Sequence, residues 1–271
     1  MSIKYFCSSD IHSFFKAWMD ALVENGFEVE NINHHIVICG DLFDRGPDAR
    51  ECLSFAKEMA KQGRLHYVRG NHEDLLCDCY HDLMFGRSSI SHHHISNGTI
   101  DTVRQFMNHL HMYDILNGIY ERADLRKNVS EDVLDFIQEH CVDYFEVADH
   151  IFVHGWLPCV HNNDPIYYEL DEYNNIYPNW RDDIDTPERD EYWEQSRWIN
   201  GMLAWAQGMR LPGKTIVCGH FHSSWGHAHI HGVSPEWGPT ANFNMFKDNG
   251  IIALDGCTAY TGKVNVYTLE V

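Results

Sequence analysis

Short apolar runs alternate with amphipathic stretches along most of the chain. Each run ends in a polar turn, which is typical of a buried strand. The runs lie at 4–10, 36–39, 65–68, 144–147, 150–153, 215–218, 251–255 and 264–271. Segments 14–24 and 48–62 have apolar residues at helical spacing, and Ser13 is the expected N-cap of the first helix. Strands that alternate with helices predict an α/β fold with parallel strands.

Two long segments interrupt this alternation, and we interpret both as insertions in a single domain over 1–271. Segment 75–142 is polar and helical in pattern, so we expect a helical cap on the sheet. Segment 156–210 begins with an irregular stretch and continues as a helix at 191–207. Long irregular loops in compact domains are usually lids or binding loops.

Four composition features limit the compartment and the partners. The chain has 20 Lys and Arg against 40 Asp and Glu, a net charge of −20. Such a surface repels nucleic acid and anionic membranes, so we expect neither as a partner. No run approaches the roughly 20 apolar residues of a membrane span, and residues 1–10 lack a secretory pattern. We therefore expect a cytoplasmic protein whose nine cysteines stay reduced.

Metal-binding side chains follow the apolar runs directly. The carboxyl ends of parallel strands form one edge of a sheet, where open α/β folds bind ligands. The candidates are Asp10, His12, Asp41, Asn71, His154, His220 and His222. Nitrogen and oxygen ligands without thiolate suit Mn, Fe or Zn better than Ca. Seven ligands exceed the needs of one ion, whereas two ions that share one carboxylate use them all.

Each motif alone also has a purely structural interpretation. The stretch from Gly40 to Gly46 (GDLFDRG) could be an acidic turn, and Asp10-Ile11-His12 a capping turn. The triplet His92-His93-His94 favours a surface loop, with a metal or substrate role left open. The alternation at 227–231 fits an exposed strand or loop as well as a metal tract. Cys77-x-Cys79-x-His81 lacks the second cysteine pair of a zinc ribbon.

Five motifs together resemble the calcineurin-like metallophosphoesterases, and within them the phosphoprotein phosphatase branch. They are Asp10-Ile11-His12, Gly40-Asp41-Leu42-Phe43-Asp44-Arg45-Gly46, Arg69-Gly70-Asn71-His72-Glu73, Val153-His154-Gly155 and Gly219-His220-Phe221-His222. Their order and spacing match across nearly the whole chain. The ending, 254–264, resembles the bacterial phosphatases and the symmetrical dinucleoside tetraphosphate hydrolases.

The resemblance implies a four-layer α/β/β/α sandwich and a role for each matching residue. Metal 1 would be held by Asp10, His12, Asp41 and His222, and metal 2 by Asp41, Asn71, His154 and His220. His72, oriented by Asp44, would protonate the leaving oxygen, and Arg45 would bind phosphate oxygens. Arg197 is the expected second phosphate contact. Ser9 and Ser13 stand where the branch usually has glycines, and His222 where its protein phosphatases usually lack a second histidine.

The leading hypothesis is a dinuclear-metal phosphomonoesterase of the Ser/Thr protein phosphatase type, acting on phosphorylated protein or a small phosphorylated molecule. The first alternative is hydrolysis of a dinucleoside polyphosphate such as diadenosine tetraphosphate. The second is a catalytically silent metal-binding module. Aromatic residues after His154 could stack on a nucleobase or form a structural lid. They are Trp156, Tyr167, Tyr168, Tyr173, Tyr177 and Trp180.

Overall fold

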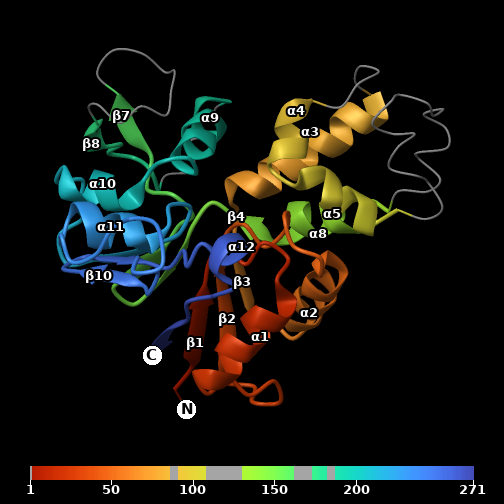
Figure 1. Cartoon of the computed structure of the whole chain (residues 1–271), viewed down its shortest axis with the longest axis horizontal. Coiled ribbons are helices and arrows are strands. Elements are labelled where there is room, and N and C mark those ends of the chain that lie inside the picture. The colour runs from red at the N-terminus through yellow and green to blue at the C-terminus, as the bar shows by residue number, and fades with distance from the viewer. Residues whose placement is uncertain (1, 86–90, 108–129, 162–172, 182–186) are drawn as a thin grey trace.

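Two five-stranded sheets form the centre of the molecule (Figure 1). The computed structural model describes residues 2–85, 91–107, 130–161, 173–181 and 187–271. Tyr167, Tyr168 and the side chain of Tyr173 lie outside the described part. Among the described helices, none is both long enough and apolar enough to cross a bilayer.

The first sheet has the order β12-β1-β2-β3-β4. Its parallel strands are β1 (Lys4–Ser8), β2 (His34–Cys39), β3 (Leu65–Val68) and β4 (Cys141–Val142). The last strand, β12 (Tyr267–Glu270), pairs with β1 in the antiparallel sense. The carboxyl ends of β1, β2 and β3 therefore meet at one edge, as the apolar runs predict.

The second sheet has the order β10-β11-β9-β6-β5. Its inner strands, β11 (Ile251–Ala253), β9 (Thr215–Cys218) and β6 (His150–Phe152), are parallel. Both edge strands, β10 (Phe246–Asp248) and β5 (Phe145–Val147), pair in the antiparallel sense. The carboxyl ends of β6 and β9 deliver His154 and His220 beside each other.

Three apolar cores show that the expected four-layer sandwich is correct. Alternate strand residues such as Cys7, Val37, Val217 and Leu254 pack between the sheets. The opposite face of the first sheet packs on α1 (Phe15–Glu24), α2 (Ala49–Lys61), α3 (Asn71–Phe85) and α8 (Asp132–His140). The opposite face of the second sheet packs on α9 (Pro187–Ser196) and α10 (Gly201–Ala206).

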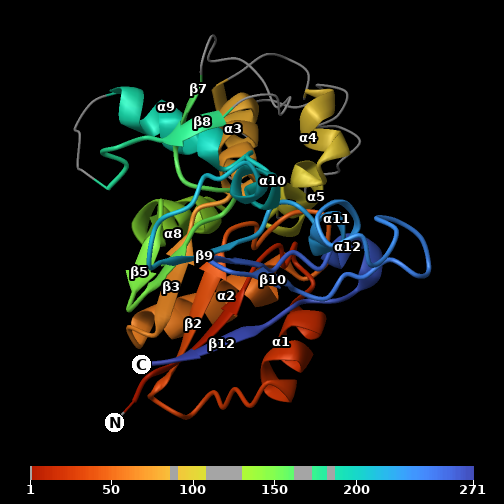
Figure 2. The same cartoon turned by 90° about the vertical axis from the view of Figure 1, so that its left-hand side faces the viewer.

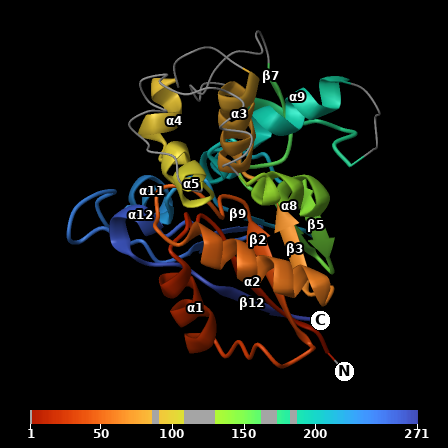
Figure 3. The same ribbon diagram turned by 90° about the vertical axis from the view of Figure 1, so that its right-hand side faces the viewer.

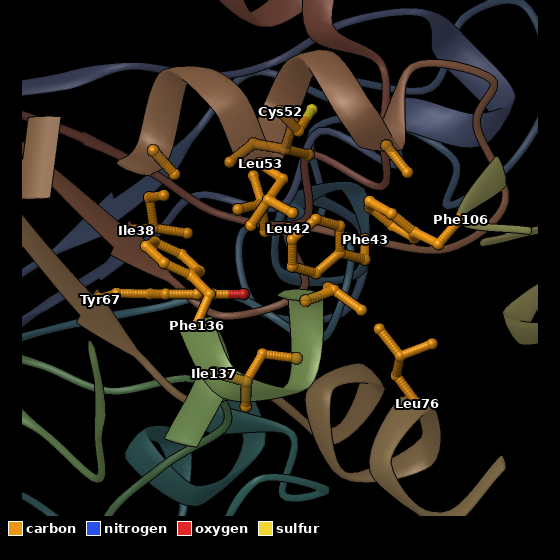
Figure 4. Packing of buried hydrophobic residues seen from close by; sticks show 14 of the residues in the cluster. Ile38, Leu42, Phe43, Cys52, Leu53, Tyr67, Leu76, Phe106, Phe136 and Ile137 are labelled. Atoms are coloured by element: carbon orange, nitrogen blue, oxygen red, sulfur yellow. The ribbon is translucent and has the colours of Figure 1, made fainter. Parts of the chain in front are cut away.

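The first insertion shares the core of the first sheet. Figure 4 shows Phe106, from the insertion, beside Leu42 and Phe43 of the loop after β2. Both loop residues are fully buried. These two side chains anchor the loop in the apolar core, while the neighbouring Asp41 and Asp44 belong to the site.

Three sequence expectations differ from the structure. The triplet at 92–94 lies in the short helix α4 (His92–Ser96), because Ser91 caps it by accepting a hydrogen bond from the N–H of His93. It is followed by α5 (Thr99–Gln105). The segment 227–231 falls largely in α11 (Ser223–His229) and is not a strand. Ser13 does not cap α1, since Phe14 occupies that position and Ser13 has φ of 60°.

The second insertion is more regular than its composition suggests. It contains a two-stranded sheet of β7 (Cys159–His161) and β8 (Tyr173–Ile176). The single helix expected at 191–207 is in fact α9 and α10. Asn200 separates them because its side chain accepts hydrogen bonds from the first N–H groups of α10. A further short helix, α12 (Thr258–Thr261), lies in the C-terminal segment.

Candidate metal centre

The backbone of the candidate centre is held in left-handed conformations. Asp10, His12, Asp41 and His220 have φ between 50° and 64°. Non-glycine residues adopt this region at a cost of roughly 1–3 kcal/mol each, which the surrounding structure must impose. Strain concentrated at four residues that follow three strand ends is typical of a functional site.

Asp41 lies at the middle of the centre. Its Oδ2 is 3.8 Å from Nε2 of His12, and its Oδ1 is 3.3 Å from Nε2 of His154. Two groups of ligand atoms therefore share Asp41, one with His12 and His72 and the other with His154 and His220. A carboxylate whose two oxygens face different clusters is suited to bridge two cations.

Hydrogen bonds fix the tautomers of two histidines. Nδ1 of His12 lies 3.0 Å from the carbonyl oxygen of Phe43, and Nδ1 of His154 lies 2.8 Å from that of Cys39. A carbonyl only accepts, so each Nδ1 carries the proton and each Nε2 presents a lone pair. Such outer contacts are usual for metal-binding histidines.

Asn71 approaches the lone pair of His154 closely. Its Oδ1 lies 2.8 Å from Nε2 of His154. Both atoms are acceptors when the imidazole carries its proton on Nδ1, so a cation bound by both would stabilise this arrangement. These two residues come from different sheets, which is how the fold brings the predicted ligands together.

Asp10 borders the centre. Its Oδ1 is 4.0 Å from Nε2 of His12, and its Oδ2 accepts from the hydroxyl of Ser9 and from the N–H of His220. The Ser9 hydroxyl oxygen also lies 2.9 Å from the carbonyl oxygen of Cys39, so its single proton is shared between the two acceptors. Ser9 therefore fixes the Asp10 carboxylate in place.

Glu73 anchors the two loops of the first sheet, a role that the sequence did not reveal. Its Oε2 accepts from the N–H groups of Gly70 and Asp41, and its Oε1 from the N–H of Leu42 and the hydroxyl of Tyr67. The side chain is fully buried. A Cβ on Gly70 would overlap Oδ1 of Asp41, so glycine permits this close approach.

His72 and Asp44 form a buried pair beside the two clusters. Nδ1 of His72 donates to Oδ2 of Asp44 at 2.7 Å. Asp44 also accepts from the hydroxyls of Thr99 and Thr102 in α5. No sequence motif points to these two threonines, because they lie in segment 75–142, far from the motifs.

Arg45 donates to both histidines of the first group. Its Nη1 lies 2.8 Å from Nε2 of His12, and its Nη2 lies 3.0 Å from Nε2 of His72. The guanidinium is a cation placed where ligand lone pairs converge. The donor set therefore accommodates positive charge, as a metal centre must.

Burial shifts the protonation of these groups toward their neutral forms. It raises the pKa of Asp41, aided by the charge of Asp10, and raises the pKa of Asp44 to about 7. Burial lowers the pKa of His12 well below its usual range, and it lowers the pKa of His72 with the help of Arg45. Neutral imidazoles are the form that binds metal.

Two predicted residues are held elsewhere. Nε2 of His222 lies 2.9 Å from Oε1 of Glu236, and neither ligand group found among the described residues includes His222. Arg197 donates to Asp74 at 2.7 Å and to Asp143 at 2.8 Å, and it is buried. Both terminal nitrogens of Arg197 are thus paired with carboxylates, and the residue joins the end of α9 to α3. Its role as a phosphate contact stays a prediction.

The other candidate motifs contribute no further metal group within the described ranges. Cys79, a residue of α3, is buried in the core of the first sheet. His94 lies beside Asp82. Of the aromatic residues expected to stack on a base, Trp156 is fully buried and Trp180 packs on Tyr144. Both have structural positions, which fits the interpretation of a lid better than that of a stacking loop.

Comparison with known proteins agrees with this geometry. A family model described as calcineurin-like phosphoesterase matches residues 3–254. A bis(5'-nucleosyl)-tetraphosphatase PrpE [asymmetrical] of Halalkalibacterium halodurans is 25% identical over 136 residues, 46% of this chain and 52% of that protein. The protein of the same name from Oceanobacillus iheyensis is 29% identical over 69 residues, 23% of this chain and 28% of that protein. The chain thus matches about half or less of the length of these relatives.

A solved structure shows the same fold. The cold-active protein-tyrosine phosphatase of a psychrophilic Shewanella species superposes with a TM-score of 0.52 and 15% identity, over 98% of this chain and 75% of that one. The strand-end ligands, the shared Asp41 and the family match over nearly the whole length lead to one assignment. The chain belongs to the calcineurin-like phosphoesterase family.

Proposed function

We propose that this chain is a phosphomonoesterase that works with two transition-metal ions of the Mn, Fe or Zn type. The observation that carries the proposal is the position of Asp41, whose two oxygens face two separate ligand groups. Asp10 and His12 would complete one site, and Asn71, His154 and His220 the other. Ions bound in this way polarise phosphoryl oxygens and activate water.

Arg45 is the proposed phosphate-binding residue. Its two terminal nitrogens donate to Nε2 of His12 and to Nε2 of His72. A metal ion bound to His12 would occupy the lone pair of that Nε2. In the loaded protein these nitrogens are the donors available to phosphate oxygens. A guanidinium matches two phosphate oxygens in a bidentate manner.

His72 is the proposed proton donor to the leaving oxygen. Its Nδ1–H is held by Asp44, so its Nε2 is the atom that faces the substrate side. Asp44 stabilises the imidazolium form, and Thr99 and Thr102 fix the orientation of its carboxylate. Burial and, after it, the charge of Arg45 lower the pKa of His72. A dianionic phosphate bound to Arg45 would offset the second of these causes.

Hydrolysis of a dinucleoside polyphosphate is the second candidate. It is favoured by the names of the curated relatives, which are tetraphosphatases. It would use the same metal ligands, and the two activities differ in the leaving group and in what binds beside the centre. A silent metal-binding module is the remaining alternative, and intact His72, Asp44 and Arg45 oppose it.

A substrate panel tests the proposal. The manganese-loaded protein is assayed with an aryl phosphate, a phosphopeptide, a cyclic nucleotide and diadenosine tetraphosphate. We expect turnover of the two monoesters to exceed that of the other substrates. Exclusive hydrolysis of the tetraphosphate would replace the proposal by its alternative, and no turnover of any substrate with two ions bound would favour the silent module.

A further inference from the structure

A pocket of about 360 Å³ lies beside the proposed phosphate site, lined by α3, α4 and the end of α9. Figures 2 and 3 show these three helices together beyond the carboxyl ends of the strands. Trp198 lines the pocket and packs on His220, with ring centroids 5.6 Å apart. Asp74, which also lines it, belongs to the same helix, α3, as Asn71 and His72. Through Trp198 the pocket borders His220, one of the proposed metal ligands.

The pocket is acidic, and part of its charge is unbalanced. Asp74, Asp78 and Asp82 follow each other at a spacing of four residues along one face of α3, and Glu194 of α9 lines the same pocket. Asp74 is neutralised by Arg69 and by Arg197. Asp78 and Glu194 form no hydrogen bond or ion pair with another described residue.

The surroundings of these two carboxylates disfavour their ionised forms. Partial burial, followed by the charge of Asp74, raises the pKa of Asp78 and that of Glu194, although His94 opposes the shift at Asp78 and Arg197 opposes it at Glu194. A cation placed between them would offset these effects and favour their ionised forms.

His94 supplies an independent sign of a ligand. Its side chain lines the pocket, is only 4% exposed, and has Nε2 at 3.6 Å from Oδ2 of Asp82. Its Nδ1 is buried and has no partner in the described part of the chain. With the proton on Nε2 toward Asp82, Nδ1 is a lone pair that can accept an N–H bond. Carboxylates, an imidazole lone pair and the Trp198 ring together suit an ammonium or guanidinium group.

We propose that this pocket binds a Lys or Arg side chain of a phosphoprotein substrate, and so selects phosphorylated sites that have a basic neighbour. The inference rests on the proposed phosphomonoesterase function and names its substrate class. His72 and Asp78 are six residues apart on α3, or about 9 Å along the axis. An extended peptide advances about 3.3 Å per residue. The basic residue should therefore lie about three positions from the phosphorylated one, and a polyphosphate chain should be disfavoured.

Matched phosphopeptides test the proposal. Phosphoserine peptides with Arg three residues before or after the phosphoserine are compared with their Ala counterparts, using the manganese-loaded protein. We expect kcat/KM to favour one Arg peptide by about five- to tenfold. In the double variant Asp78→Asn/Glu194→Gln the ratio should fall below twofold. Glu191→Gln, an exposed change on the same helix outside the pocket, should keep the ratio of the unchanged protein.

A binding measurement separates this inference from the proposed function. Phosphonate analogues of the same peptides are not hydrolysed, and their Kd is read by fluorescence anisotropy. An Arg preference in Kd that the double variant loses supports the pocket even if no substrate is turned over, in which case the phosphomonoesterase function fails alone. Equal kcat/KM and equal Kd for Arg and Ala peptides, or a preference that survives in the double variant, would overturn the inference.

Discussion

The metal centre and the acidic pocket lie side by side but are built in opposite ways. In the centre, Asp41, His12 and His154 are buried. His12 and His154 are held by hydrogen bonds to carbonyl oxygens, and the backbone of Asp41 and His12 is strained. In the pocket, Asp78 and Glu194 are exposed side chains of helices. The first arrangement holds its ligand atoms in defined orientations, as catalysis requires. The second leaves charge available to a partner, so we expect chemistry and substrate choice to depend on different side chains.

Of the changes predicted for the metal centre, removal of the proposed proton donor should cause the largest loss of activity. We expect His72→Asn to reduce turnover of alkyl phosphates by about 10²–10⁴-fold, because Asn cannot supply a proton. The loss should be smaller for aryl phosphates, whose leaving groups hardly need one. Rates are measured on both substrates, and metal content is measured beside them.

The result for His72→Asn also decides whether His72 is a ligand, since its Nε2 lies 4.0 Å from Oδ2 of Asp41. Two retained ions with a substrate-dependent loss support the acid role. An equal loss on both substrates, or the loss of an ion, would contradict it.

Loosening the anchor of the centre should cost stability. In the unchanged protein each carboxylate oxygen of Glu73 accepts two hydrogen bonds. In Glu73→Gln one of these oxygens is replaced by an NH₂ group. Whichever way the amide is turned, this NH₂ group faces two hydrogen-bond donors. A buried donor left facing donors costs about 1–3 kcal/mol, so we expect a loss of about 2–4 kcal/mol in the free energy of unfolding. Urea denaturation measures it.

The control for Glu73→Gln is Glu58→Gln, an exposed change on α2. That variant should differ from the unchanged protein by less than about 0.5 kcal/mol. A similar small effect for Glu73→Gln would show that the loops do not depend on this carboxylate.

The contacts of Glu73 could not be predicted from the sequence. The predicted strand ends indicated which residues converge, because the carboxyl ends of parallel strands lie at one edge of a sheet. The pattern could not show that Glu73 turns inward to bind two loops, or that His222 turns toward Glu236, since both depend on side-chain direction. Thr99 and Thr102 were missed for a related reason: they belong to a polar insertion whose contacts with Asp44 span more than 50 residues.

A smaller effect is expected away from both regions, at the face between the sheets. Burial, with His35 beside it, lowers the pKa of His66 to about 4. Because the unfolded chain binds this proton near pH 6.5, stability is complete above that pH and falls as the pH decreases toward 4. We expect about 1–2 kcal/mol from this residue after allowing for solvent screening.

Urea denaturation between pH 7 and pH 4 measures the contribution of His66. The loss of stability should be shallower in His66→Phe, which keeps the stack on Phe145 and cannot be protonated. His92→Phe, at an exposed position of α4, should show the slope of the unchanged protein. An equal dependence of the unfolding free energy on pH in all three proteins would show that His66 does not contribute to it.

The most direct test of the central claim is the metal content of Asp41→Asn. The two oxygens of Asp41 face the two proposed cation sites, so the loss of one charged oxygen should weaken both. Elemental analysis after dialysis against manganese should give two ions per chain for the unchanged protein and fewer than two for the variant. His222→Ala, which removes a histidine held by Glu236, should retain two. Two ions retained in Asp41→Asn would contradict the bridged centre.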